Sequence, residues 1–352
     1  MEIVIRQMLP EEARAVQKLG RKSFPYLEAL YIPKPKNALV ALHGGLPVAA
    51  FTYTIETAGG KKLGRVDFLY THPDFSGSGV GRRLCEAGFA FLWGEGCDLL
   101  TTFVRDDNPA SWRIFERGGF VRASFFSGLA GQIGVWGTLT QMVKSMQGFS
   151  PAHDLYLALP GGESEAARKK TGSAGQIAAY LSVHLLLGLL AAFRAGGDLL
   201  LVPAAIAAVF LGLVLAGYLG TLPSRRRWRF RMTNGGGIFS LLFGLIGRGS
   251  FFPMVGGWYP EVYEKTPAFR RDLAINAMAG WAFLLLALPL ARHWGAAIPL
   301  LGTAYPILAF LAVFRCFPLR VVDSFGFGRV FSWNKIAAGL FVAATLALVY
   351  LF

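Results

Sequence analysis

The chain has 352 residues, enough for two domains of ordinary size. It is 54% hydrophobic and only 16% charged, with a mean hydropathy of +0.45, which is typical of a membrane protein rather than a water-soluble one. The net charge of +14 indicates cytoplasmic loops beside anionic lipids, so we expect a lipid bilayer as partner and no nucleic acid. The three cysteines are scattered without metal-ligand spacing, so we expect buried thiols in a reducing compartment and no metal site.

Residues 1–160 alternate between strand-like and helix-like patterns. They predict an α/β domain in which a mixed sheet is flanked by helices. The expected strands are 3–6, 38–43, 47–56, 65–71, 98–105 and 120–127, with a last strand at 155–159 or near Val143. The expected helices are 10–24, a run from about residue 80 to Trp93, and 108–117.

Residues 161–175 form a polar linker that ends in a basic cluster, and residues 176–352 predict an all-α polytopic membrane domain of five to six spans. Five apolar runs of about 17–21 residues are long enough to cross a bilayer core of ~30 Å. These runs are 176–193, 199–219, 273–291, 296–316 and 336–352. A sixth run, 235–257, is rich in glycine and contains Arg248, so we expect a re-entrant segment.

The distribution of basic residues predicts the orientation. The linker and the run 225–231, which holds five arginines around Trp228 and Phe230, should both face the cytoplasm. We therefore expect a multi-pass protein of the cell membrane with a cytoplasmic N-terminal domain. Arg248 is costly within a membrane unless it is paired, with Asp323 as one candidate, or faces a headgroup or substrate pocket.

A glycine-rich loop follows the expected strand 65–71 and opens the next helix. It reads Ser76-Gly77-Ser78-Gly79-Val80-Gly81-Arg82. Such a turn exposes several backbone N–H groups at a helix N-terminus, where a phosphate or pyrophosphate is favoured. Glycine suits the loop because the backbone must approach the phosphates closely and some positions need positive φ.

The segment from Asn108 to Phe120, together with this loop and its lead-in from Thr71 to Phe75, resembles the GNAT N-acetyltransferase superfamily over about residues 1–130. The resemblance implies acetyl-CoA, or another acyl-CoA, as cosubstrate. Pyrophosphate would lie on the loop and the pantetheine arm along the fourth strand. The implied cofactor residues are Leu69, Tyr70, Thr71, Ser76, Gly77, Ser78, Gly79, Val80, Gly81, Arg82, Asn108, Ser111 and Phe115.

Two positions depart from this family's pattern. Ser76 stands where an Arg or Gln usually begins the loop, and Phe115 stands where many members carry a Tyr that protonates the leaving thiolate. The amine that attacks the thioester must lose a proton. One candidate base is Asp67, which period-two alternation places on one face with Leu69 and Thr71. The other candidates are Asp106 and Asp107, at the end of the fifth strand. A salt-bridged strand carboxylate and a helix cap are the alternative interpretations.

The membrane half contains segments that resemble site-2 proteases. Residues 317–329, which include Asp323, are similar to a segment that supplies a zinc ligand in those enzymes, and Ala279-Gly280 and the glycines from 235 match further segments. The His-Glu-x-x-His expected near 215–220 is missing, and a zinc site needs at least three ligands. The resemblance therefore implies a degenerate scaffold without protease chemistry, and the missing motif favours an unrelated helical bundle as the alternative.

Together these features predict a membrane-anchored N-acetyltransferase that transfers an acyl group from acyl-CoA to an amine of a membrane-associated or hydrophobic acceptor. A second hypothesis is a non-catalytic acyl-CoA sensor that regulates a transporter-like, channel-like or pseudo-protease membrane domain. A membrane protease with an accessory domain is a third, which the missing zinc motif disfavours.

Overall fold

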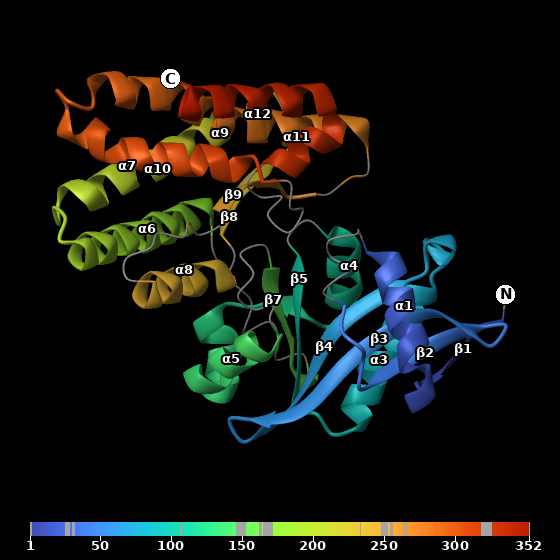
Figure 1. Cartoon of the computed structure of the whole chain (residues 1–352). Coiled ribbons are helices and arrows are strands. Elements are labelled where there is room, and N and C mark those ends of the chain that lie inside the picture. Colours follow the sequence, from blue (N-terminus) through green and yellow to red (C-terminus); the bar gives the residue numbers. More distant parts are fainter. Residues whose placement is uncertain are drawn as a thin grey trace. The chain divides into compact units, whose positions relative to one another are not determined.

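The computed structural model divides into two compact units, residues 1–148 with 154–169 and residues 149–153 with 170–352 (Figure 1). The structure describes residues 2–24, 29, 32–105, 108–145, 153–161, 164, 172–232, 234–247, 253, 256–262, 264, 266–317 and 326–351. The domain limits expected at 160 and 176 stay predictions, because most of the segment between them lies outside these ranges.

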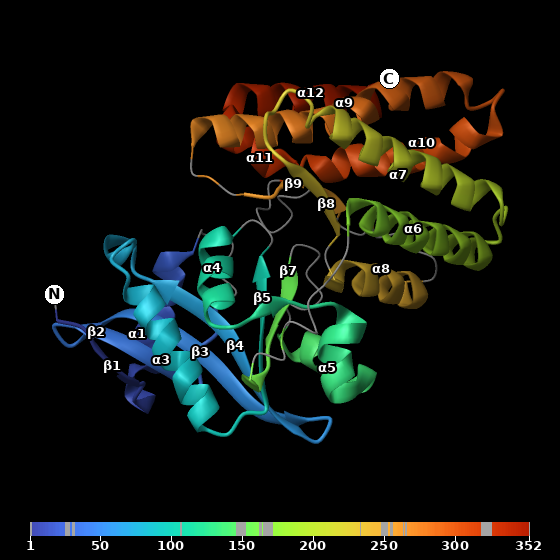
Figure 2. The ribbon, with the colours of Figure 1, turned by 180° about the vertical axis from the view of Figure 1, so that it is seen from behind.

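The first unit is built on a seven-stranded sheet with the order β1-β2-β3-β4-β5-β7-β6 (Figure 2). Strands β1 to β4 pair antiparallel, β4 and β5 pair parallel, and β6 and β7 pair antiparallel. The sheet is therefore mixed, as predicted. Its strands are β1 (Val4–Gln7), β2 (Ala38–His43), β3 (Leu46–Ala58), β4 (Lys61–Thr71), β5 (Leu99–Arg105), β6 (Val121–Arg122) and β7 (His153–Ala158).

Helices cover both faces of this sheet. They are α1 (Ala13–Ser23), α3 (Val80–Gly94), α4 (Pro109–Arg117) and α5 (Gly131–Ser145). Val40 of β2 lies in a cluster with side chains of α1, whereas its neighbours Leu39 and Ala41 lie in the cluster formed with α3. Since successive side chains of a strand point to opposite faces, α1 and α3 pack on opposite sides of the sheet.

The end of this unit differs from the sequence-based expectation. The strand expected over 120–127 is only two residues long, and a π-helical segment, Phe125–Ala130, follows it. The alternative of a strand near Val143 is wrong, because that residue lies within α5. Trp136 and Val143 are exposed on α5. The last strand is β7, so the other expected position, 155–159, is confirmed.

The second unit consists of helices and a short hairpin. The helices are α6 (Ser173–Ala195), α7 (Leu201–Leu219), α8 (Asn234–Ile246), α9 (Pro267–Trp294), α10 (Pro299–Arg315), α11 (Phe327–Trp333) and α12 (Lys335–Tyr350). The expectation of an all-α domain is wrong in one respect. Strands β8 (Trp228–Met232) and β9 (Gly256–Pro260) pair antiparallel, because alternating arginines and aromatic side chains in the run 225–231 suit a half-buried strand.

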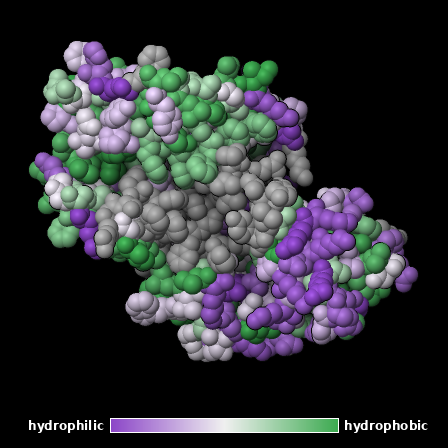
Figure 3. Space-filling view, viewed as in Figure 1, coloured by the Kyte–Doolittle hydropathy of each residue, from purple (hydrophilic) through white to green (hydrophobic). Residues whose placement is uncertain are grey.

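Three helices, α6, α7 and α9, are long and apolar enough to cross a membrane, and α10 and α12 are shorter apolar helices. Helix α8 has 13 residues and is therefore about 20 Å long, shorter than the ~30 Å of a bilayer core. Large apolar side chains such as Phe193, Leu286 and Ile336 are 69–75% exposed. In the view of Figure 3, hydrophobic residues cover broad areas of the helical unit, as expected of a surface that meets lipid.

Candidate active site of the α/β unit

The central feature of the first unit is the point where β4 and β5 part. Their parallel pairing ends at Val66 and Thr102, although β4 continues to Thr71 and β5 to Arg105. The hydroxyl of Thr102 donates to the carbonyl of Val66 at 3.1 Å. A side-chain hydrogen bond therefore takes the place of the backbone hydrogen bonds between the two strands at the point where these end. Beyond this point one edge of β4 is free of β5, which leaves backbone groups for an extended ligand.

The glycine-rich loop lies at the N-terminus of α3, directly after β4. Gly77 and Gly79 both have φ of +81°, and a Cβ on either would meet no atom within 4 Å. In the hydrogen bonds of the described residues, the N–H groups of Gly77, Gly79, Gly81 and Arg82 have no acceptor. Four free donors at a helix N-terminus, with space in front of the glycines, form a cradle for phosphate oxygens.

The serines of the loop stabilise its turn. The hydroxyl of Ser78 donates to the carbonyl of Phe75 at 2.6 Å, and the N–H of Ser76 donates to the carbonyl of Pro73 at 3.0 Å. Arg82 projects from the first turn of α3 with 56% of its side chain exposed, 3.6 Å from Glu86. An exposed cation next to the free N–H groups is suited to a second phosphate.

The end of β4 lies beside this loop. A Cβ added to Gly81 would be 3.1 Å from Oγ1 of Thr71, so glycine permits the close approach of helix and strand. Leu69 packs with the α3 cluster, and Tyr70 packs on the opposite face with side chains of α1. The structure thus brings Leu69, Tyr70 and Thr71 together with the loop residues of the predicted cofactor site.

Tyr70 is only 3% exposed, and its hydroxyl has no hydrogen-bond partner among the residues that the structure describes. Burial raises the pKa of this phenol, so the hydroxyl stays protonated at neutral pH. Its ring lies against Gly20, where a Cβ would be 3.0 Å from the ring carbon that carries the hydroxyl. Tyr70 is therefore part of the core, and only its backbone is available to a ligand.

The other predicted cofactor residues lie on α4. The side chain of Asn108 accepts a hydrogen bond from the N–H of Ser111 at 3.3 Å and caps the helix. Phe115 is 3% exposed, and its ring centroid lies 5.6 Å from that of Phe89 and 5.2 Å from that of Phe120. The structure places Phe115 in the hydrophobic core, whereas Asn108 and Ser111 lie at the N-terminus of α4, after the carboxyl end of β5.

Asp67 lies at an irregularity of β4. Thr52 pairs with Phe68 and Tyr53 with Val66, so Asp67 has no partner on β3. This bulge interrupts the alternation of side chains, because Leu69 lies on the same face as Val66, three residues before it. The shared face predicted for Asp67, Leu69 and Thr71 is therefore wrong.

The Asp67 carboxylate is held by two neighbours on its face of the sheet. Arg65 Nε donates to it at 2.7 Å, and the hydroxyl of Thr54 donates to its other oxygen at 2.7 Å. The side chain remains 23% exposed. This arrangement agrees with the alternative interpretation of Asp67, a strand carboxylate held in a salt bridge. Its role as a base stays a prediction, and the other candidate, Asp106, lies outside the described residues.

Sequence analysis did not predict the polar cluster around Arg65. Arg65 is 6% exposed, and its guanidinium also donates to Glu56 at 3.1 Å and to Gln141 of α5 at 2.8 Å. Lys144 pairs with Glu56 as well. Burial opposes ionisation of Glu56, but hydrogen bonds from Lys144 and Gln141 and the charge of Arg65 outweigh it and lower the pKa of this carboxyl. The partners are separated by up to 88 residues, so no local pattern could have revealed the cluster.

Comparison with known proteins supports a specific family for this unit. Residues 5–120 match the model of the Acetyltransferase (GNAT) family. A mycothiol acetyltransferase of Salinispora tropica is 30% identical over 121 residues, which are 33% of this chain and 37% of the relative. A mycothiol acetyltransferase of Geodermatophilus obscurus is 38% identical over 64 residues, 18% of this chain and 21% of the relative. The chain thus spans little more than a third of the curated relatives at most.

The chain is also similar to solved acetyltransferase structures. The ribosomal-protein-S18-alanine N-acetyltransferase of Escherichia coli shares 14% identity at a TM-score of 0.31, covering 48% of this chain and 97% of that one. An acetyltransferase of Brucella melitensis in complex with acetyl-CoA shares 20% identity at a TM-score of 0.26, covering 32% and 81%.

Proposed function

We propose, from the acetyltransferase (GNAT) domain that residues 5–120 form, that this protein is a membrane-anchored, acyl-CoA-dependent N-acetyltransferase. The observation that carries the proposal is the loop between β4 and α3. Its four free N–H groups lie beside the edge of β4 that β5 leaves uncovered. A pyrophosphate on the loop and an extended amide-bearing arm along β4 would use both features at once, and acetyl-CoA has this chemistry.

The reaction transfers an acyl group from a thioester to an amine. The amine nitrogen forms a bond to the carbonyl carbon, the carbon–sulfur bond breaks, and the proton from the amine must reach a base. Asp67 and Asp106 are our candidates for that base. A backbone N–H near Tyr70, on the free edge of β4, is our candidate donor to the oxyanion.

The acceptor is proposed from the second unit. A single helix would anchor the domain, yet the described part of the chain contains three helices that are long and apolar enough to cross a membrane. We propose that the additional helices bring the acceptor amine within the membrane plane, either on a lipid-linked or hydrophobic molecule or on a membrane protein. We do not infer the acceptor from the name of the mycothiol acetyltransferases, because the match covers only part of each chain.

The location follows from charge. With the basic segment 225–231 inside, we propose a multi-pass protein of the cell membrane whose acetyltransferase domain lies in the cytoplasm, where acyl-CoA is made. Helices α6, α7, α9, α10 and α12 would be the five spans, with α8 as the re-entrant element.

The second candidate is an acyl-CoA sensor without turnover. Phe115 favours it, because this side chain has no hydroxyl and is packed between two other phenylalanines, so it offers no acid to the leaving thiolate. In this version the second unit, with its site-2-protease-like segments, is the regulated part.

Cofactor binding is tested by the thermal midpoint of the full chain in detergent with and without acetyl-CoA. Binding to the folded state raises the midpoint. Gly79→Trp should abolish the shift because its indole fills the space in front of the free N–H groups. Gly60→Trp is the matched control, since Gly60 also has open surroundings and a φ of +79° but lies in the β3–β4 turn. The absence of a shift in the native protein would overturn the proposal.

Release of free thiol from acetyl-CoA, measured with a panel of hydrophobic and lipid-linked amines, separates the two candidates. Amine-dependent release supports the transferase. A thermal shift without release for any amine supports the sensor.

A further inference from the structure

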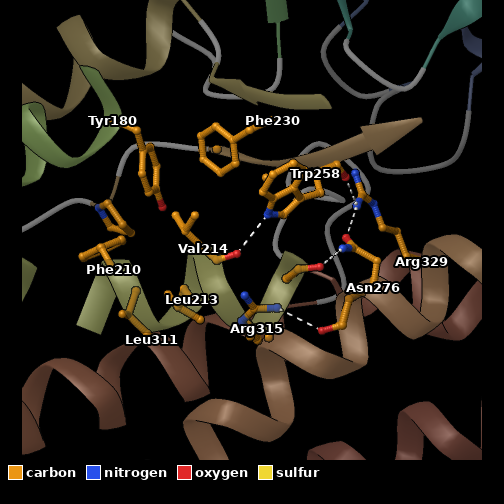
Figure 4. A pocket seen from close by; sticks show the side chains of 16 residues that line it. Tyr180, Phe210, Leu213, Val214, Phe230, Trp258, Asn276, Leu311, Arg315 and Arg329 are labelled. Carbon is orange, nitrogen blue, oxygen red and sulfur yellow. Dashed lines mark hydrogen bonds between the residues drawn. The ribbon is translucent and has the colours of Figure 1, made fainter. Parts of the chain in front are cut away.

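A cavity of about 60 Å³ lies inside the helical unit, near the β8–β9 hairpin (Figure 4). Its walls include Tyr180, Phe230, Trp258, Asn276, Arg315 and Arg329. Since one water needs roughly 10–15 Å³ by this measure, the cavity holds the equivalent of about four waters. That is room for a small polyatomic group but not for a long chain.

The cavity lies at one end of the helices. Gly217 and Arg315 are near the C-termini of α7 and α10, whereas Tyr180 and Asn276 are in the N-terminal parts of α6 and α9. The basic segment 225–231 follows α7 and runs into β8 at this same end. By the charge rule this is the cytoplasmic end, whose leaflet is rich in anionic lipid.

Arg329 carries a positive charge into this cavity. It is 7% exposed, and it donates to the Trp258 carbonyl at 3.5 Å and to Asn276 Oδ1 at 3.4 Å. Its guanidinium carbon lies 4.6 Å above the ring of Tyr259. All these partners are neutral and both hydrogen bonds are long, and no carboxylate of the described residues pairs with this arginine. Neutral partners at these distances offset only part of the cost of burying a guanidinium.

Arg315 brings a second guanidinium to the same wall. It donates to the Ala277 carbonyl at 3.4 Å. A Cβ on Gly280 would lie 3.0 Å from its Nη2, so glycine at this position makes room for the side chain. The wall of this small cavity thus carries two guanidinium groups, whose N–H donors suit the oxygens of an anion.

The neutral groups around the arginines are already fixed. Trp258 donates its indole N–H to the Val214 carbonyl at 2.9 Å, and Asn276 donates its amide N–H to the Gly217 carbonyl at 2.7 Å. The second bond leaves Asn276 Oδ1 directed toward Arg329. A ligand therefore meets a preorganised site and causes little reorganisation.

We propose that this cavity binds a phosphate group, held between Arg315 and Arg329. Guanidinium groups match the oxygens of phosphate in a two-pronged geometry, and the size of the cavity admits the group but not the remainder of a lipid. The group comes either from free phosphate or from the headgroup of an anionic lipid of the cytoplasmic leaflet. The site lies in the second unit and is separate from the cradle formed by Gly77 to Arg82.

Binding is measured on the full chain in detergent by thermal shift, with three probes: inorganic phosphate, short-chain phosphatidic acid and short-chain phosphatidylcholine. Phosphatidic acid should raise the midpoint in a saturable way, and phosphatidylcholine should not. Arg329→Gln should weaken the Kd at least tenfold. Arg292→Gln is the matched control, because this exposed arginine lies at the opposite end of α9 and should leave the Kd unchanged.

The outcomes decide both the proposal and the source of the phosphate. A response to inorganic phosphate alone identifies a free ion, and a response to phosphatidic acid alone identifies a lipid headgroup. If Arg329→Gln fails to fold, Arg329→Lys keeps the charge without the two-pronged donor and should weaken the Kd several-fold. Equal responses to phosphatidic acid and phosphatidylcholine, no response to any probe, or an unchanged Kd in the folded Arg329 variant would refute the site.

Discussion

Glu56 shows how the α/β unit keeps charge within a half-buried environment. Hydrogen bonds and the neighbouring cation outweigh its burial and lower the pKa of this carboxyl. A carboxyl with a lowered folded-state pKa contributes stability above its unfolded-state pKa, about 4.3, and loses it as the pH falls through the folded value.

We therefore expect the unfolding free energy of the first unit to decline as the pH falls below about 4.3. Replacing Glu56 with Gln should remove part of that decline and lower the stability at neutral pH. Chemical unfolding of the full chain between pH 3 and 7 measures this. Glu86→Gln serves as the reference, since Glu86 is 66% exposed, and its pH profile should follow the native one.

Phe115 stands where many members of the resembled family carry a tyrosine, and restoring that tyrosine tests whether its hydroxyl matters here. Phe115→Tyr would place a hydroxyl among Phe89 and Phe120, where burial without a partner costs about 1–3 kcal/mol. We expect lower stability in unfolding experiments and no gain in thiol release. Phe91→Tyr is the comparison, because Phe91 lies on α3, the helix that also carries Phe89, is half-buried and can present the hydroxyl to water. A gain in thiol release by Phe115→Tyr, without loss of stability, would show instead that this position reaches the bound thioester.

At the scale of the elements, glycines determine how closely the apolar helices of the second unit pack. A Cβ on Gly212 of α7 would lie 2.2 Å from the ring of Phe283 on α9, so the two helices meet through a residue without a side chain. Gly339 of α12 is exposed, and a Cβ there would meet nothing within 4 Å.

These two glycines should respond to alanine with opposite signs. Gly212→Ala forces Phe283 to move and should destabilise the helical unit by about 1–3 kcal/mol. Gly339→Ala only reduces the conformational freedom of the unfolded chain, so it should stabilise α12 by about 0.5–1 kcal/mol. Thermal unfolding of each variant in the same detergent measures the difference. Destabilisation by both would contradict the packing described here.

At the scale of the whole molecule, the number of crossings determines where the C-terminus lies. The proposed five spans with a re-entrant α8 would place the N-terminal domain and the C-terminus on opposite sides of the membrane. A reporter that is active only in the cytoplasm should work at the N-terminus, and one active only outside should work after residue 352. If both ends report the cytoplasm, α8 crosses or one of the short helices α10 and α12 does not.

The sequence by itself determined the glycine-rich loop, the expected mixed sheet and the apolar runs, because each depends on residues close together along the chain. It could not place Asp67, since a bulge opposite Thr52 and Tyr53 changes which face a side chain takes. It also missed the hairpin of β8 and β9, whose strands are separated by a helix. The arginine-lined cavity required the tertiary structure, because Arg329 meets Asn276 and Trp258 from positions 53 and 71 residues away. Periodicity reports local geometry, whereas such contacts depend on how distant elements pack.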